Sequence, residues 1–179
     1  MRIMVIGSGG AGKSTFSKAL GDILQHPVYH LDAFFWKEGW VPTPDGEWDD
    51  FISELARKDR WIIDGNYRRT YGLRMKQANA IIFLDMHPMI ATIRVVKRWV
   101  RYKGKARPDM NPGCPEKIDR EFIRWVWTFR KRNRDHIMCT LREHSSGTRI
   151  VVIRNPGQAR KWLDRFRKEG VEAFEQEQG

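Results

Sequence analysis

A glycine-rich segment, GSGGAGKST, begins at Gly7 directly after a short apolar run. It matches G-x-x-x-x-G-K-[S/T], a pattern that binds phosphate when it lies between a buried strand and a helix. There the glycines let backbone N–H groups converge on phosphate oxygens, and the helix N-terminus adds a favourable partial charge. The residues expected to bind a nucleoside triphosphate are Gly7, Ser8, Gly9, Gly10, Ala11, Gly12, Lys13, Ser14 and Thr15.

Lys13 and Ser14 indicate a reaction as well as a ligand. In phosphoryl transfer, the lysine of this pattern bridges the β- and γ-phosphates, and the hydroxyl group that follows it is a ligand of Mg²⁺. The expected cofactors are therefore ATP and Mg²⁺, with Lys13 catalytic and Ser14 a metal ligand.

The same glycines also fit a second phosphate-binding pattern. Gly7, Gly9 and Gly12 spell G-x-G-x-x-G, and Asp32 lies where a dinucleotide-binding fold places the acid that binds ribose. That turn gives no role to Lys13 and Ser14, whereas phosphoryl transfer uses both. We therefore favour the triphosphate-binding loop.

Five apolar runs alternate with amphipathic segments along the chain. The runs are apolar throughout rather than at every second residue, as expected of strands buried on both faces. This order predicts an α/β protein with the three-layer P-loop NTPase fold and a five-stranded parallel sheet, formed as one domain by residues 1–179. The predicted strands are residues 2–6, 28–31, 61–63, 80–84 and 149–153, and the predicted helices follow Lys13, carry Trp48, carry Ile90, start near Ile118 and carry Trp162.

Two segments interrupt this alternation. Residues 36–46 are rich in aromatic and turn-forming residues, and we expect residues 34–58 to bind the phosphoryl acceptor. Residues 103–115 contain two glycines and three prolines between two basic helices, so residues 101–118 are predicted to form a lid loop. An acidic tail is expected over residues 169–179.

Carboxylates lie at the ends of three predicted strands, where open α/β sheets hold their ligands. Asp32 can orient an acceptor hydroxyl or accept its proton, so we expect it to be catalytic and to contact the substrate, the alternative being a turn or helix-capping role. Asp64, followed by Gly65, can hold Mg²⁺ or its water. Asp85 leads into His87 and Pro88, and we expect it to be structural.

Three further residues are candidates for contact with the acceptor. Asn66 and Arg69 belong to a polar cluster directly after Asp64. Trp36 can stack on an acceptor ring, although it can equally belong to the core.

The chain has a formal net charge of +11, and residues 94–134 hold 14 Lys or Arg against 4 Asp or Glu. Arg98 shares one helix face with other arginines, and Arg107 lies in the lid loop, so both are expected to reach the transferring phosphoryl group. A localised positive field also fits nucleic acid, or a pair of helices that faces only solvent. The basic run 130–134 is expected to face solvent or a partner.

Other features narrow the protein class. No apolar run approaches the roughly 20 residues that cross a bilayer, and the N-terminal apolar stretch is too short for a signal peptide. Cys114 and Cys139 have no metal-binding spacing and are expected to be free thiols. These features predict a cytoplasmic protein that does not bind membranes.

The motifs GSGGAGKST, YHLDAFFW, WIIDGNY, IIFLD and RYKGKARPDM, with the CPEKID and WVWTFRKR segments, together resemble one family. It is the adenylate-kinase-like P-loop proteins known as DNA topology modulation proteins, and the resemblance covers roughly residues 1–155. It implies a nucleoside-monophosphate-kinase-like fold with a basic lid, Asp32 and Asp64 near the reaction centre, and Arg98 and Arg107 in the lid. Asp64-Gly65-Asn66-Tyr67 departs from the D-G-F-P-R of adenylate kinases, which puts AMP as the acceptor in doubt.

Two functions are compatible with these features. The first is ATP- and Mg²⁺-dependent transfer of a phosphoryl group to a small acceptor, such as a nucleotide, nucleoside or similar alcohol. The alternative is a nucleotide-binding protein that engages nucleic acid through residues 94–134 and modulates DNA topology. The chain has no helix-turn-helix, zinc-finger or RNP-like signature, which favours the kinase.

Overall fold

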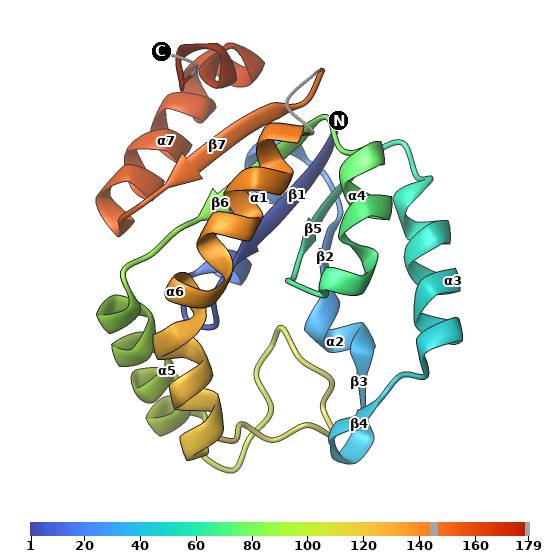
Figure 1. Cartoon of the computed structure of the whole chain (residues 1–179), viewed down its shortest axis with the longest axis vertical. Coiled ribbons are helices and arrows are strands. Elements are labelled where there is room, and N and C mark those ends of the chain that lie inside the picture. The colour runs from blue at the N-terminus through green and yellow to red at the C-terminus, as the bar shows by residue number, and fades with distance from the viewer. Residues whose placement is uncertain (144–146, 178–179) are drawn as a thin grey trace.

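A computed structural model describes residues 1–143 and 147–177 of the chain (Figure 1). Its centre is a five-stranded parallel sheet with the strand order β2-β5-β1-β6-β7. The strands are β1 (Arg2–Gly7), β2 (Val28–His30), β5 (Trp61–Asp64), β6 (Ala80–Leu84) and β7 (Arg149–Ile153). Each corresponds to one of the predicted apolar runs, so the predicted sheet is confirmed.

Seven helices accompany the strands in the described part of the chain. The five expected helices are present, and the one predicted near Ile118 begins at Arg120. Two short helices, α2 and α4, were not predicted, because five and seven residues are too few to show a helical period. The helices are α1 (Lys13–Leu24), α2 (Leu31–Phe35), α3 (Asp45–Ala56), α4 (Tyr71–Gln77), α5 (Pro88–Tyr102), α6 (Arg120–Glu143) and α7 (Pro156–Glu169).

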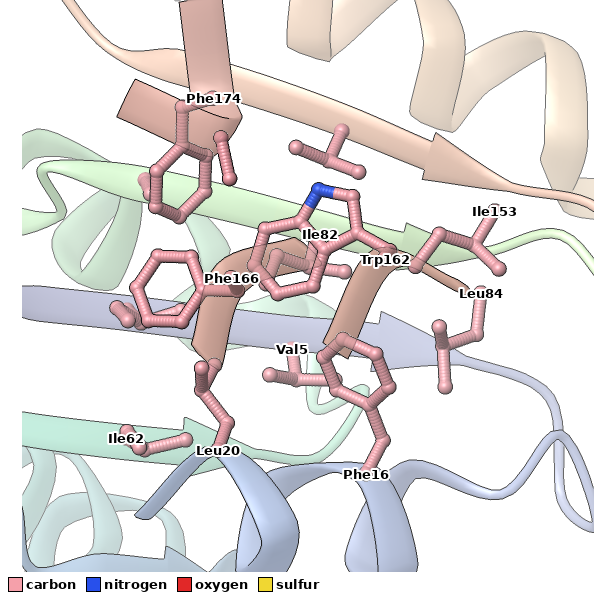
Figure 2. Close-up of a cluster of buried hydrophobic side chains, with 14 of the residues drawn as sticks. Val5, Phe16, Leu20, Ile62, Ile82, Leu84, Ile153, Trp162, Phe166 and Phe174 are labelled. Atoms are coloured by element: carbon pink, nitrogen blue, oxygen red, sulfur yellow. The ribbon is translucent and has the colours of Figure 1, made fainter. Parts of the chain in front are cut away.

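Two hydrophobic clusters cover the two faces of the sheet and give the fold its three layers. On one face, α1 and α7 pack over β1 and its neighbours, and Figure 2 shows Phe16, Leu20, Trp162 and Phe166 around Val5. On the other face, buried residues of α3, α4 and α6 pack against the same strands. Because both faces are covered, the central strands are continuously apolar rather than alternating.

The C-terminal segment adds to the first cluster. Residues Gly170–Glu177 form 3₁₀ turns, and Phe174 packs edge-on against Phe166 with the ring centroids 5.4 Å apart. The predicted acidic tail is therefore partly folded onto the core, and residues 178–179 lie outside the described residues.

The predicted aromatic loop after β2 is more ordered than expected. It contains a small hairpin of β3 (Trp36–Lys37) and β4 (Val41–Pro42), joined by a 3₁₀ turn over Glu38–Trp40. The loop between α5 and α6 lies below the carboxyl ends of the central strands and extends to this hairpin (Figure 1). There the Gly39 N–H donates to the Gly113 carbonyl at 3.0 Å, and the Trp40 indole donates to the Pro115 carbonyl at 3.1 Å.

None of the helices in the described residues has the length and apolar character needed to span a bilayer. The two cysteines in that part of the chain are free thiols, as expected, with Cys114 buried and Cys139 exposed.

Candidate active site

The glycine-rich loop leads from β1 into α1 along a path that side chains would obstruct. Gly10 has a φ of 73°, and a Cβ atom there would lie 2.2 Å from the Ala91 carbonyl oxygen. Gly12 has a φ of 98° and immediately precedes Lys13, the first residue of α1. The loop is therefore tightly packed, as close approach of backbone amides to a phosphate requires.

Lys13 lies among the groups predicted to take part in phosphoryl transfer. Its ammonium group donates to the Gly7 and Ser8 carbonyls at 3.0 and 3.1 Å. Burial lowers the pKa of Lys13, an effect that the nearby carboxylates of Asp32 and Asp64 oppose. Since burial penalises this charge, an anionic ligand at the loop would stabilise the protonated lysine.

The segment that follows β5 is held in an unusual backbone conformation. Gly65 has a φ of 143°, and Tyr67 has a φ of 22°, which is rare for a residue with a side chain. The fully buried guanidinium of Arg74 donates to the carbonyls of Gly65, Asn66 and Tyr67, each at 3.0 Å. Burial lowers the pKa of Arg74 to about 10. Arg74 thus holds this segment in place through three of its backbone carbonyls.

The fixed segment directs two side chains to other parts of the site. The Tyr67 hydroxyl donates to an Asp32 carboxylate oxygen at 2.7 Å. Burial raises the pKa of Tyr67, and the Asp32 carboxylate raises it further, so Tyr67 remains a hydrogen-bond donor. The Asn66 side-chain oxygen accepts from the Gly7 N–H at 3.2 Å, which ties the segment to the start of the phosphate-binding loop.

Asp64 lies at the carboxyl end of β5, directly beside His30 on the neighbouring strand β2. It is only 4% exposed, and its carboxylate is 2.5 Å from the His30 Nδ1. Burial disfavours the charged imidazole, but the hydrogen bond and the charge of Asp64 outweigh it and raise the pKa of His30.

Two arginines of the predicted lid meet at one buried carboxylate. The Glu116 carboxylate accepts a hydrogen bond from the Arg98 Nε at 2.8 Å and forms an ion pair with Arg107, whose Nε lies 2.6 Å away. Both arginines contribute to the electrostatic environment of Lys13, so they lie on the same side of the molecule as the phosphate-binding loop. The lid loop is therefore folded over the loop that begins at Gly7.

Asp109 connects the lid loop to the predicted metal ligand. It accepts a hydrogen bond from Ser14 and lies 3.3 Å from Arg107. Burial would raise the pKa of Asp109, but Arg107 and the hydrogen bond from Ser14 outweigh it and hold that pKa below its usual value. Ser14, Asp64 and Asp109 offer only oxygen donors, the ligand type that Mg²⁺ prefers.

The structure places other basic residues in structural roles. Arg94 of α5 donates to the Ala11 carbonyl at 3.1 Å and so supports the phosphate-binding loop. Asp85 is buried and forms ion pairs with Arg130 and Arg134 of α6, at 2.8 and 2.9 Å. The structural role expected of Asp85 agrees with this contact. The prediction that residues 130–134 face solvent or a partner did not include this contact: the Arg130 and Arg134 side chains are 37% and 33% exposed and also pair with Asp85, because a buried carboxylate requires a counter-charge.

The remaining acceptor candidates occupy different environments. Trp36 is half-buried in the hairpin, edge-on to Trp40 with the ring centroids 5.6 Å apart. Arg69 is 54% exposed and pairs with Asp45 and Asp49 at the start of α3. The Arg69 side chain is therefore held in ion pairs at the surface of α3, while the Asn66 side chain is hydrogen-bonded to the phosphate-binding loop.

Sequence reasoning missed several residues of this arrangement. His30 could have been found, because it lies near the end of the predicted strand 28–31, at the same edge of the sheet as Asp64. Asp109 and Glu116 stand out as acidic residues in a basic stretch, which suggests internal pairing. For Tyr67 and Arg74 the sequence contains no such signal, since their contacts depend on the turn after β5.

Comparison with known proteins identifies the fold. No family model matches the chain, and no curated protein sequence matches it. A shikimate kinase from Acinetobacter baumannii, solved in complex with shikimate, is similar with a TM-score of 0.52 and 14% identity over 92% of this chain and 89% of that one. A gluconokinase from Sinorhizobium meliloti 1021 has a TM-score of 0.51 and 16% identity over 98% and 91%.

A shikimate kinase from Bacteroides thetaiotaomicron is similar over 94% of this chain and 96% of its own, with a TM-score of 0.50 and 17% identity. The fold is therefore that of the small P-loop kinases, as the sequence predicted. At these identities the likeness describes architecture, and the chemistry has to be argued from the residues of this chain.

Proposed function

We propose that this protein is an ATP- and Mg²⁺-dependent kinase that transfers the γ-phosphoryl group of ATP to a hydroxyl group of a small acceptor. The observation that supports this most strongly is the set of charges around Lys13. Two carboxylates, Asp32 and Asp64, and two lid arginines, Arg98 and Arg107, all act on its ammonium group. Phosphoryl transfer depends on positioning and charge stabilisation of this kind.

The phosphate-binding loop is suited to the donor. Backbone amides of residues 7–15 and the N-terminus of α1 would bind the β-phosphate, with Lys13 between the β- and γ-phosphates. Arg98 and Arg107 would stabilise the charge on the transferring group, and the lid loop would exclude water from it.

Asp32 is proposed to act on the acceptor. The acceptor oxygen would attack the γ-phosphorus, the bond from that phosphorus to the β,γ-bridging oxygen would break, and the hydroxyl proton would pass to Asp32. Tyr67 would hold the Asp32 carboxylate in position through its hydrogen bond of 2.7 Å. Trp36 and the rest of residues 34–58 are proposed to shape the acceptor pocket, with Asn66 and Arg69 at its margin.

Ser14 and Asp64 supply oxygen donors of the type that Mg²⁺ prefers. Ser14 and Asp64, directly or through water, would hold the ion with the nucleotide, and its charge would screen the phosphate oxygens. Since ATP is the donor, we also propose a cytoplasmic location.

The experiment that tests this proposal measures ATP consumption with a panel of nucleotides, nucleosides and sugar-like alcohols. We expect at least one acceptor to raise ATP turnover well above the rate without acceptor, and Lys13→Ala to abolish that increase. If no acceptor raises turnover above a slow ATPase background, the kinase proposal is wrong.

The nucleic-acid alternative gains no support from the arrangement of charges. Five of the 14 Lys and Arg of residues 94–134 make internal contacts, which reduces the expected basic surface: Arg94, Arg98, Arg107, Arg130 and Arg134. The relation to the DNA topology modulation proteins remains part of our proposal. DNA affinity that rises steeply as salt falls, without any acceptor-stimulated turnover, would favour this alternative.

A further inference from the structure

Glu116 is a buried acidic residue in the most basic part of the chain. It is 6% exposed as a residue and its side chain only 2%, and it lies where the lid loop returns toward α6. Its backbone N–H donates to the Lys105 carbonyl at 2.9 Å, and its backbone pairs with that of Lys103 in an isolated parallel β-bridge. The two ends of the lid loop are therefore joined at the residue that carries this carboxylate.

The carboxylate separates two positive charges that would otherwise repel each other. Burial lowers the pKa of Arg98, and the charge of Arg107 lowers it further, while Glu116 opposes both effects. Without a buried anion, the two guanidinium groups would lower the free energy of the protein by moving apart or toward solvent. Glu116 therefore keeps both arginines together before any phosphate arrives.

The geometry of the contact leaves the arginines available for a second anion. The Arg98 Nε donates a hydrogen bond to one carboxylate oxygen of Glu116, whereas the Arg107 Nε lies 2.6 Å from the other oxygen in an ion pair without hydrogen-bond geometry. A guanidinium is planar and carries four further N–H donors on its terminal nitrogens. Glu116 therefore contacts the Nε side of each guanidinium group, and Asp109 accepts from one terminal nitrogen of Arg107 at 3.3 Å.

We propose that Glu116 is a positioning residue that holds Arg98 and Arg107 in the orientation in which they bind the transferring phosphoryl group. This inference rests on the proposed kinase function and adds a residue to it. Because its side chain is only 2% exposed, Glu116 would contact neither ATP nor the acceptor and would act through the two arginines.

The kinetic test compares Glu116→Gln with the wild-type protein and with Glu121→Gln. Glu121 is an exposed residue at the start of α6, so its variant makes the same charge change outside the lid contact. In Glu116→Gln, one oxygen acceptor is replaced by a donor, and the arginines lose their common orientation. We expect kcat to fall about 10²-fold, as for a misplacement of about 1 Å, with ATP affinity changed far less. Glu116→Asp should recover part of kcat, and Glu121→Gln should behave as wild type.

A double-mutant cycle separates positioning from general stabilisation. If Glu116 acts through Arg107, then Glu116→Gln should lower kcat much less in an Arg107→Ala background than in the wild-type background. Equal fold-losses in both backgrounds, or a loss of thermal stability with kcat unchanged, would overturn the proposal.

A readout independent of turnover keeps this test distinct from that of the kinase function. In ¹⁵N NMR spectra, the Nε–H signals of Arg98 and Arg107, assigned from Arg→Lys variants, should move in Glu116→Gln. ATP with Mg²⁺ should shift the same signals in the wild-type protein and shift them less in the variant. If no acceptor is phosphorylated, the kinase function fails. If ATP leaves both arginine signals unchanged in the wild-type protein, the Glu116 proposal also fails.

Discussion

The Tyr67 hydroxyl donates a hydrogen bond of 2.7 Å to Asp32, across the gap between the turn after β5 and the start of α2. Removing this donor in Tyr67→Phe leaves the carboxylate without its partner and free to rotate. We expect kcat for the best acceptor to fall about tenfold, roughly the value of one charge-assisted hydrogen bond, with the KM for ATP unchanged.

The matched control for this variant is Tyr71→Phe. The Tyr71 hydroxyl lies 3.4 Å from the Asn66 side-chain oxygen, a longer contact that does not involve Asp32. Steady-state kinetics of both variants with saturating ATP would check the prediction. If the two variants lose the same activity, Tyr67 has no special relation to Asp32.

The buried hydrogen bonds of Arg74 lead to a second prediction, which concerns stability. In Arg74→Met the Gly65 and Asn66 carbonyls lose their donor, while the Tyr67 carbonyl still accepts from Thr70, and an unsatisfied buried group costs about 1–3 kcal/mol. We expect the free energy of unfolding to fall by about 3 kcal/mol or more in urea titrations. Arg69→Met, which removes an exposed ion pair close to the same segment, should lower the free energy of unfolding much less. Equal losses in the two variants would contradict a clamping role for Arg74.

The contact between His30 and Asp64 predicts a pH dependence of stability. The pKa of His30 is raised in the folded protein above its ordinary value of 6.5. Its contribution to stability is therefore fully present below about pH 6.5 and is lost as the pH rises through the folded pKa. The difference in unfolding free energy between wild type and His30→Gln should be larger at pH 5.5 than at pH 9 in buffer containing EDTA. A constant difference across this range would show that the pair is not ionic.

Much of the framework of this site was predictable, because each part has a local pattern. Apolar runs marked the strands, and the spacing from Gly7 to Ser14 marked the phosphate-binding loop. Because the carboxyl ends of parallel strands meet at one edge of a sheet, the sequence predicted that Asp32 and Asp64 lie near the same site. The two Pro- and Gly-rich interruptions indicated where a lid loop and an acceptor region would lie.

The contacts that orient these parts were not predictable from local patterns. Arg74 belongs to a seven-residue helix whose sequence does not reveal that its guanidinium faces three carbonyls. Arg69 and Arg74 are both basic residues near Asp64, and only the turn geometry decides which one is buried. Glu116 and Arg98 are 18 residues apart and meet because the lid loop folds back on α5. Such contacts depend on tertiary structure rather than on spacing.

The most direct test of the account is the effect of Arg107→Ala on kcat and on ATP affinity measured separately. If the lid arginines stabilise the transferring phosphoryl group, kcat should fall by about 10³-fold. ATP binding measured by calorimetry should weaken by less than about tenfold, since the loop that begins at Gly7 holds most of the triphosphate. An unchanged kcat would contradict the central claim that the closed lid brings Arg98 and Arg107 to the reaction centre.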